Sequence, residues 1–261
     1  MPRIALSISY DGSDWLGWQT QPSGMTVQDQ VEKAITSFTG SYHPTICAGR
    51  TDAGVHALNQ VIHLDATVIR QEHSWVRGLN AHLPSSIAVQ WATEVPDDFH
   101  ARFSAHSRRY VYVIHNSPVR HPLLHGRAGW VFQPLNVPDM AKAIQYIQGE
   151  HDFSSFRSSQ CQAATPIRNM LHADATRNGS LVILDFCANA FLHHMIRNLV
   201  GALVLIGQGQ KPVSYMQELL LAKNRKIGAP TFSPAGLYLR SASYPAYELP
   251  VNMTDLPFFG V

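Results

Sequence analysis

The first residues of the chain alternate between apolar and polar side chains from Ile4 to Tyr10. A period of two is typical of a β-strand with one buried face. Further along, Thr26 precedes a segment whose apolar residues recur every three or four positions, with Asp29 three residues after it and Gly40 beyond the end. A capping residue at one end and a glycine at the other predict a helix between them.

The rest of the first half continues with four more elements. Two short apolar segments, 45–48 and 61–65, predict strands joined by the glycine-containing stretch 48–59. Helical spacing over 72–81 predicts a second helix, and renewed alternation over 87–95 predicts another strand. The resulting order is β-α-β-β-α-β, which is that of the ferredoxin-like fold.

The second half of the chain repeats this order. The Asn178-Gly179 pair predicts a tight hairpin, and the segment 116–135, rich in Pro, His and Gly, is expected to form a long connection. The predicted strands cover 108–115, 167–176, 181–188 and 237–242. One predicted helix begins after Pro138 and ends at Gly149, and two more cover 191–206 and 214–222.

These patterns predict a mixed α/β (α+β) fold made of two fused ferredoxin-like, RRM-like halves, residues 1–105 and 106–261. Each half is expected to form an antiparallel sheet with helices on one face. Merging the two sheets edge to edge into one extended, mostly antiparallel sheet would cover two edge strands and leave a central cleft.

Composition narrows the class of protein. With 45% hydrophobic and 15% charged residues, the chain has the composition of a folded globular protein. The longest apolar stretch, 199–206, is too short to cross a bilayer, and no secretion signal is recognised, so a cytoplasmic protein is expected. The three cysteines include no C-x-x-C pair, which predicts free thiols and neither a disulfide framework nor a zinc site.

The charge of +2 and the pI near 8.5 are modest for a nucleic-acid-binding protein. The basic residues are unevenly distributed, however. A nucleic-acid partner and an ordinary solvated surface both remain open on this pattern alone. The clustered arginines are Arg102, Arg108, Arg109, Arg120 and Arg127.

The segment 48–57 places a charged triplet between two glycines and between two predicted strands. A short carboxylate side chain held in such a loop can act as a nucleophile or general base, which makes Asp52 the candidate catalytic residue. The alternative is a turn in which Asp52 bonds its own backbone. His193 and His194 suggest a metal, but adjacent residues on a helix point about 100° apart, so no metal site is expected. Neither a P-loop nor a dinucleotide fingerprint is present.

The motifs of this chain resemble those of the tRNA pseudouridine synthase A (TruA) family over nearly the whole length. Several long motifs in the right order are more specific than one glycine-rich loop. The motifs are, in chain order, Tyr10-Asp11-Gly12 with Gly17-Trp18-Gln19, Gly49-Arg50-Thr51-Asp52-Ala53-Gly54-Val55-His56, Phe99-His100-Ala101-Arg102-Phe103 with Arg109-Tyr110-Val111-Tyr112, Asp152-Phe153-Ser154-Ser155-Phe156, Phe191-Leu192-His193-His194-Met195-Ile196-Arg197-Asn198 and Gly236-Leu237-Tyr238-Leu239.

The resemblance implies an isomerase that converts uridine to pseudouridine in the anticodon stem-loop of tRNA. It implies no cofactor, a positively charged cleft between the two halves, and a homodimer that shares one tRNA. Asp52 would be the catalytic carboxylate, and its action on the sugar C1′ and its addition to the uracil ring both stay open. Arg197 would pair with Asp52.

Further roles follow from the same resemblance. Tyr110 would lie against the uracil ring, Leu237 would pack on its other side, and Arg50 would help to displace the target nucleotide. Core packing is the alternative for Tyr110 and Leu237. The candidates for contact with the RNA backbone are Arg102, Arg109, Arg168 and Lys211.

Two other functions remain as alternatives. A non-catalytic RNA-binding or tRNA-folding module could use the same scaffold, because a fold does not guarantee activity. A hydrolase with an aspartate nucleophile would instead act on small molecules such as free nucleosides.

Overall fold

In the computed structural model, which describes residues 1–251, 256 and 259, the alternating start of the chain forms strand β1 (Arg3–Tyr10). β1 pairs antiparallel with β3 (His56–Asp65) on one side and with β4 (Ile87–Val95) on the other. The two-residue strand β2 (Ile46–Cys47) pairs antiparallel with β3. Near its start, β3 also pairs in parallel with β10 (Leu237–Ser243).

Helix α1 (Val27–Thr39) forms where the caps predict it. The Thr26 side chain accepts a hydrogen bond from the backbone N–H of Asp29, and Gly40 ends the helix with a φ of 81°. The apolar stripe that includes Val27 and Ile35 is buried. Helix α2 (Glu72–Asn80) buries Trp75 and Leu79 and packs on β4.

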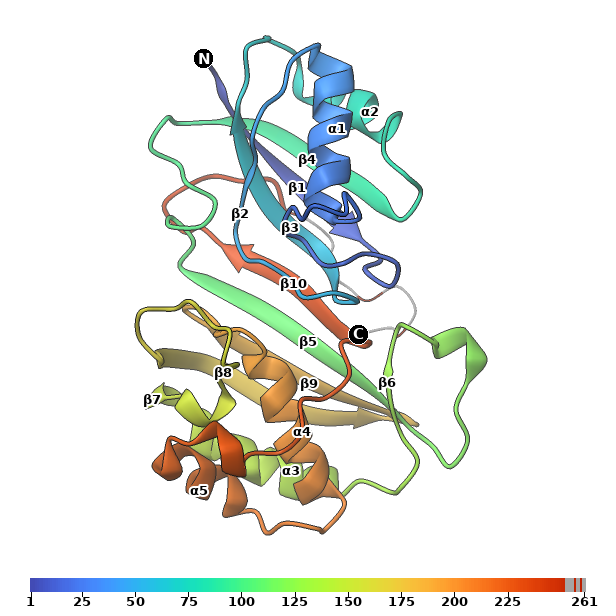
Figure 1. The fold of residues 1–261 in the computed structure, drawn as a ribbon, viewed down its shortest axis with the longest axis vertical. Helices are drawn as coiled ribbons and strands as arrows, with labels where there is room; N and C mark the ends of the chain where they lie inside the picture. Colours follow the sequence, from blue (N-terminus) through green and yellow to red (C-terminus); the bar gives the residue numbers. More distant parts are fainter. Residues whose placement is uncertain (252–255, 257–258, 260–261) are drawn as a thin grey trace. The chain divides into compact units, whose positions relative to one another are not determined.

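The chain divides into two units (Figure 1). Unit 1 comprises Met1–Arg108 and the described residues from Tyr238 onward, and unit 2 comprises Arg109–Leu237. The sequence pattern places the closing strand in the second half of the chain, whereas in the structure all of β10 except its first residue belongs to unit 1. Long-range pairing with β3 brings it there. The predicted C-terminal half also extends over residues 252–255, 257–258 and 260–261, which lie outside the described residues.

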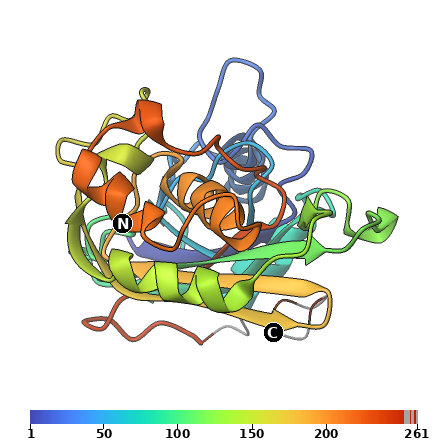
Figure 2. The ribbon, with the colours of Figure 1, turned by 90° about the horizontal axis from the view of Figure 1, so that it is seen from below.

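In unit 2, helix α3 (Val137–Ile144) packs on strand β8 (Ile167–Asn178) (Figure 2). The strands of this unit follow the order β5-β9-β8-β7, and the short β6 pairs in parallel with β5. The strands are β5 (Ser107–Asn116), β6 (Gly129–Val131), β7 (Gly149–Asp152), β8 (Ile167–Asn178) and β9 (Leu181–Ala188). The helices are α3 (Val137–Ile144), α4 (Met195–Gly207) and α5 (Tyr215–Ala222), with 3-10 turns η1 (Pro122–Leu124), η2 (Gln145–Ile147), η3 (Ser154–Phe156) and η4 (Arg225–Ile227).

The predicted mixed α/β class is confirmed. Along the chain, β1-α1-β2-β3-α2-β4 is followed by β5-β6-α3-β7-β8-β9-α4-α5-β10, so the β-α-β-β-α-β order occurs twice, the second time with β6, β7 and α5 added. β6 and β7 were not predicted, because three or four residues are too few to show a period. The hairpin between β8 and β9 forms as predicted, but its two-residue loop is Gly179-Ser180, with Gly179 at a φ of 58°. Among the described residues, the helices are too short or too polar to span a bilayer.

Candidate active site

The loop that carries Asp52 runs over residues 48–55, from the end of β2 to the start of β3. β3 begins at His56, five residues before the predicted start, so the loop is shorter than the predicted stretch 48–59. The side chain of Asp52 is half-buried, while that of Arg50 is exposed. A backbone hydrogen bond of 3.1 Å from the Val55 N–H to the Asp52 carbonyl closes a turn directly after the carboxylate.

The N-terminal segment of the chain holds this loop from one side. The hydroxyl groups of Tyr10 and Thr51 lie 2.8 Å apart in a buried contact. The Trp18 N–H donates to the Thr51 carbonyl at 3.0 Å, and the Gly54 N–H donates to the Trp15 carbonyl at 3.2 Å. The loop is therefore fixed immediately before and shortly after Asp52.

Two glycines allow these backbones to approach so closely. A Cβ at Gly17, which has a φ of 88°, would lie 2.6 Å from the Thr51 carbonyl oxygen. A Cβ at Gly12 would lie 2.0 Å from the carbonyl oxygen of Val55. Any other residue at either position would push the loop away. The opening motif of the sequence thus has a structural task, since it provides the surface on which the Asp52 loop rests.

Two buried polar side chains, Gln60 and Arg108, form hydrogen bonds with the backbone at the start of the loop. The Gln60 side chain accepts from the Gly49 N–H at 3.3 Å and donates to the Gly49 carbonyl. The Arg108 guanidinium donates from Nε and Nη2 to the Ala48 carbonyl, at 3.1 and 2.9 Å. These bonds satisfy backbone groups that the short β2 leaves without a strand partner.

Two cations, Arg50 and Arg102, lie within electrostatic range of Cys47, which directly precedes the Asp52 loop. Burial raises the pKa of the Cys47 thiol to about 12, and the positive charges of Arg50 and Arg102 partly oppose this rise. The side chains of Arg50 and Arg102 are both exposed. The start of the Asp52 loop is therefore bordered by positive charge that is accessible from solvent.

The structure places Asp52, Arg50 and Arg102 in unit 1 and the other six predicted site residues in unit 2. In unit 2, Tyr110 on β5 is 7% exposed and packs edge-to-face on Phe191, with ring centroids 5.1 Å apart. Leu237 is buried at the start of β10.

Arg197 lies in the first turn of α4 and is half-buried. Its Nε donates to the Phe232 carbonyl at 2.8 Å, and the Phe232 N–H donates to the Arg197 carbonyl at 3.1 Å. The segment that leads to β10 therefore fixes part of this guanidinium.

The four RNA-backbone candidates differ in how much of their charge is available. Arg109 forms a bidentate ion pair with Asp185, with N–O distances of 2.5–3.0 Å. Arg168 donates to the Thr165 carbonyl at 2.9 Å, and burial lowers its pKa.

Arg102 and Lys211, in contrast, are exposed, and each lies over an aromatic ring. The charge of Arg109 is already compensated within the fold, whereas Arg102 and Lys211 present theirs to solvent.

Contrary to the prediction, His193 and His194 do not lie on a helix. Helix α4 begins at Met195 and not at Phe191, so the two histidines lie in the turn before the helix, with His194 at a φ of 63°. Their ring centroids are 4.0 Å apart. The helical geometry that was expected to separate them does not apply.

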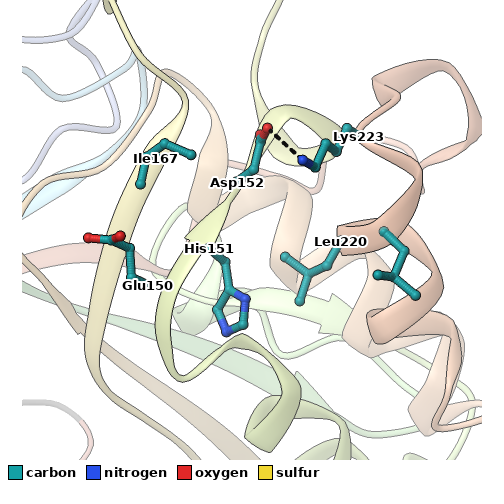
Figure 3. Close-up of a pocket in the computed structure, with 7 residues that line it drawn as sticks. Glu150, His151, Asp152, Ile167, Leu220 and Lys223 are labelled. Carbon is teal, nitrogen blue, oxygen red and sulfur yellow. Dashed lines mark ion pairs between the residues drawn. The ribbon is translucent and has the colours of Figure 1, made fainter.

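A shallow pocket of about 320 Å³ lies in unit 2 beside β7 and the end of α5 (Figure 3). Lys223 Nζ and Asp152 Oδ2 face each other across it at 3.6 Å. The lining residues are Glu150, His151, Asp152, Ile167, Leu220, Leu221 and Lys223. The predicted site residues lie elsewhere in the chain.

Among the residues that hold the Asp52 loop, Tyr10 belongs to the opening motif and Arg108 to the clustered arginines, but neither pattern links them to that loop. Gln60 falls between the predicted loop 48–59 and the predicted strand 61–65. Arg108 lies near the start of β5 between Ser107 and Arg109, so no local pattern shows that its guanidinium is the buried one.

Residues 6–104 and 143–245 match a family model described as tRNA pseudouridine synthase. The proteins named tRNA pseudouridine synthase A from Bordetella parapertussis and Bordetella avium are 59% and 58% identical to the chain, over 94% and 96% of its length and 92% and 95% of their own. The protein of that name from Janthinobacterium sp. is 54% identical over 95% of this chain and 94% of its own.

A crystal structure of a Cbf5-Nop10-Gar1 complex is similar over 90% of this chain and 48% of its own, with a TM-score of 0.35 and 12% identity, which is too weak a likeness to bear on fold or function. The family match and the close relatives confirm the resemblance found in the motifs. The chain belongs to the tRNA pseudouridine synthase A family, whose members are isomerases.

Proposed function

We propose that this chain isomerises uridine to pseudouridine in the anticodon stem-loop of tRNA, with Asp52 as the catalytic carboxylate. In this reaction the C1′–N1 bond breaks, the uracil turns, and C1′ bonds to C5. C5 loses its proton and N1 gains one, so the product is an isomer of the substrate. No electrons are transferred, and the proposal therefore needs no redox cofactor.

The observation that carries this proposal is the way in which the Asp52 loop is held. Its backbone is hydrogen-bonded to Trp15, Trp18 and Gln60, and the Thr51 side chain contacts the Tyr10 hydroxyl. A carboxylate that must act on one atom of a displaced nucleotide benefits from such rigidity, because small misplacements are costly to catalysis. A turn that served only to connect two strands would not need contacts from so many elements.

Asp52 has two chemical routes in this proposal. It either attacks the sugar C1′, or assists the departure of N1 there, or it adds to the uracil ring. Both routes use the same carboxylate in the same loop. Trapping the adduct with a tRNA that carries 5-fluorouridine, followed by mass spectrometry of the linkage, distinguishes attachment to the sugar from attachment to the base.

The roles of the other residues are proposals that rest on the family resemblance. Arg197 pairs with Asp52, orienting the carboxylate and balancing its charge. A cation about 4 Å from a carboxylate is worth on the order of 4 kcal/mol at an effective dielectric near 20. Tyr110 and Leu237 enclose the uracil, and Arg50, whose side chain is exposed, helps to displace the nucleotide.

Contacts with the RNA backbone are proposed for Arg102, Arg168 and Lys211. Arg109 is the weakest of the four candidates, because Asp185 neutralises its charge. We further propose that the protein acts in the cytoplasm as a homodimer that shares one tRNA, with a positively charged cleft between its halves.

The test of the proposed reaction is tritium release from tRNA transcribed with 5-tritiated uridine. Wild-type protein is expected to release tritium, whereas Asp52→Asn binds the same tRNA and releases none. Asp98→Asn, which changes an exposed aspartate of the same unit, is the matched control and should keep wild-type turnover.

Three results would contradict the proposal. Binding of tRNA without release of tritium by the wild type would favour an RNA-binding module. Cleavage of free uridine would favour a small-molecule hydrolase. Wild-type release by Asp52→Asn would remove Asp52 from the chemistry.

A further inference from the structure

The loop between β4 and β5 presents an exposed aromatic ring. Phe103 is 75% exposed. On one side its ring stacks on His100, with centroids 4.3 Å apart and planes inclined by 27°. The guanidinium carbon of Arg102 lies 5.4 Å from the centroid of the same ring. We refer to His100, Arg102 and Phe103 as the platform.

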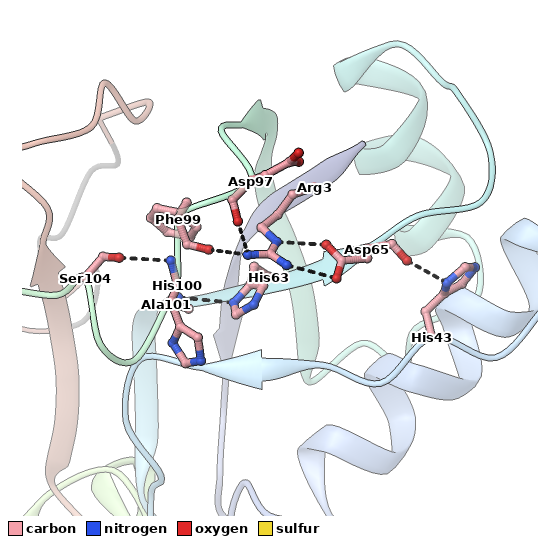
Figure 4. A network of polar contacts seen from close by, with 9 residues as sticks. All are labelled: Arg3, His43, His63, Asp65, Asp97, Phe99, His100, Ala101 and Ser104. Atoms are coloured by element: carbon pink, nitrogen blue, oxygen red, sulfur yellow. Dashed lines mark hydrogen bonds and ion pairs between the residues drawn. The ribbon is translucent and has the colours of Figure 1, made fainter. Parts of the chain in front are cut away.

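The backbone of the platform is held by a compact set of hydrogen bonds, of which Figure 4 shows one between His100 and Ser104. The Nδ1 atom of His100 accepts from the backbone N–H groups of Arg102 and Phe103, at 3.2 and 3.1 Å. His100 and Ser104 are joined by two more hydrogen bonds, of 2.9 and 2.8 Å. A nitrogen that accepts two N–H groups carries no proton, so the neutral ring of His100 has its hydrogen on Nε2.

A second set of bonds ties this loop to the core of unit 1. The Ala101 N–H donates to His63 Nδ1 at 3.1 Å, and the Ala101 carbonyl accepts from the Tyr244 hydroxyl at 2.6 Å. Ala101 is fully buried, although its neighbour Arg102 is exposed. The backbone of the loop that carries the exposed Phe103 ring is therefore fixed to the core of unit 1.

Buried Arg108 connects the platform to the Asp52 loop. Besides its two bonds to the Ala48 carbonyl, its guanidinium donates to the carbonyls of Ala105, at 3.0 Å, and of Arg102. One rigid, planar cation thus joins the start of the Asp52 loop to both ends of the turn that carries Phe103. The platform and Asp52 belong to the same tightly connected part of unit 1.

The charges around the platform favour an anionic partner on one side. Arg102 is exposed, and Arg50 lies near the same part of the chain, since both act on Cys47. At Arg3, in contrast, Asp65 pairs with the guanidinium at 2.8 Å, and the exposed Asp97 and Asp98 supply negative charge. Within the described part of the chain, uncompensated positive charge is therefore exposed at Arg102 and not at Arg3.

We propose that the platform is a base-stacking site for tRNA, in which Phe103 stacks on a nucleobase exposed at a loop or helix end and Arg102 contacts the adjacent phosphate. A single exposed phenylalanine would need no explanation. A fixed one that contacts an imidazole and a guanidinium, and still leaves three quarters of its surface exposed, has the composition of sites that bind bases without reading sequence. This inference rests on the proposed function, and it adds a binding site that is separate from the carboxylate chemistry.

The test compares Phe103→Leu, which keeps an apolar side chain but removes the ring, with Phe103→Trp, which keeps a ring. Stacking on one aromatic side chain corresponds to a roughly 5- to 150-fold change in affinity. Phe103→Leu is expected to raise both the Kd for unmodified tRNA transcript and the KM by a factor in this range, with kcat unchanged. Phe103→Trp should stay within about twofold of wild type. Phe132→Leu, at another exposed phenylalanine, is the matched control and should behave as wild type.

The failure of this inference is distinguishable from failure of the proposed function. If wild-type protein forms pseudouridine and Phe103→Leu keeps the wild-type Kd and KM, the platform does not bind tRNA. A fall in kcat alone, or an equal loss in Phe132→Leu, also overturns the inference. A changed oligomeric state of Phe103→Leu in sedimentation, with unchanged tRNA affinity, would identify the platform as a protein interface instead.

Discussion

The phenolic oxygen of Tyr10 lies 2.8 Å from the hydroxyl oxygen of Thr51, and both residues are buried. Tyr10 ends the first strand of the chain, whereas Thr51 directly precedes Asp52. The contact therefore joins the end of β1 to the residue beside the proposed catalytic carboxylate.

Tyr10→Phe tests whether this contact positions Asp52. The substitution leaves the Thr51 hydroxyl without its buried partner, which is expected to lower the free energy of unfolding by about 1 kcal/mol. If the contact positions the carboxylate, kcat for pseudouridine formation falls several-fold while KM for tRNA stays near wild type. Loss of stability with an unchanged kcat would assign Tyr10 to the core alone.

Gly17→Ala should displace the Asp52 loop. The new methyl group would lie 2.6 Å from the Thr51 carbonyl oxygen, at a backbone φ of 88°. Gly24→Ala is a matched control, because Gly24 also has a positive φ, of 67°, but no atom lies within 4 Å of its added Cβ. Backbone strain alone costs about 1 kcal/mol or somewhat more.

We therefore expect a modest loss of stability and normal turnover for Gly24→Ala, measured by urea denaturation and tritium release. Gly17→Ala should lose more stability and at least about tenfold in kcat. Equal behaviour of the two variants would show that the close approach to Thr51 does not matter.

Stability should depend on the protonation of His63. Burial, followed by the charges of Arg3 and His100, lowers the pKa of His63 to about 4. In the unfolded chain this histidine takes up a proton near its ordinary pKa of about 6.5. The stabilising contribution is therefore complete above about pH 6.5 and is lost as the pH falls toward 4, with a slope of up to about 1.4 kcal/mol per pH unit.

Urea denaturation of wild type and His63→Gln between these two pH values measures this slope. Glutamine keeps an acceptor for the Ala101 N–H but does not titrate, so the slope should decrease. The same substitution at the exposed His73 should keep the wild-type slope. An unchanged slope in His63→Gln would assign the pH dependence to other groups.

Arg102 and Arg109 should differ in the salt dependence of tRNA binding. Removing a free cation that contacts a phosphate lowers the slope of log Kd against log salt concentration by roughly one. We expect this change for Arg102→Gln. Arg109→Gln should leave the slope unchanged, because Asp185 already neutralises Arg109.

Arg109→Gln is instead expected to lower stability by about 1–3 kcal/mol, since the mostly buried carboxylate of Asp185 loses its bidentate bonds to the guanidinium. Filter binding at several salt concentrations and urea denaturation measure the two effects. If both variants lower the slope equally, the Arg109–Asp185 pair opens when RNA binds.

The sequence by itself determined the features that depend on neighbouring residues. The cap at Thr26 and the glycine at position 40 predicted the first helix, and alternation located β4 at the residues where it is found. Motifs in the right order identified the family. These signals are short-range, because capping, periodicity and turn chemistry act within a few residues of the chain.

Tertiary structure decided which of the candidate groups are free to act and what holds them. Arg109 and Asp185 are 76 residues apart in the chain, so no local pattern shows that they neutralise each other. Arg108 reaches Ala48 over 60 residues, and only the folded chain shows that this buried cation joins the Asp52 loop to the platform. A charge or a polar group is satisfied by whatever the fold brings within about 3 Å of it, and that distance is not written in the order of residues.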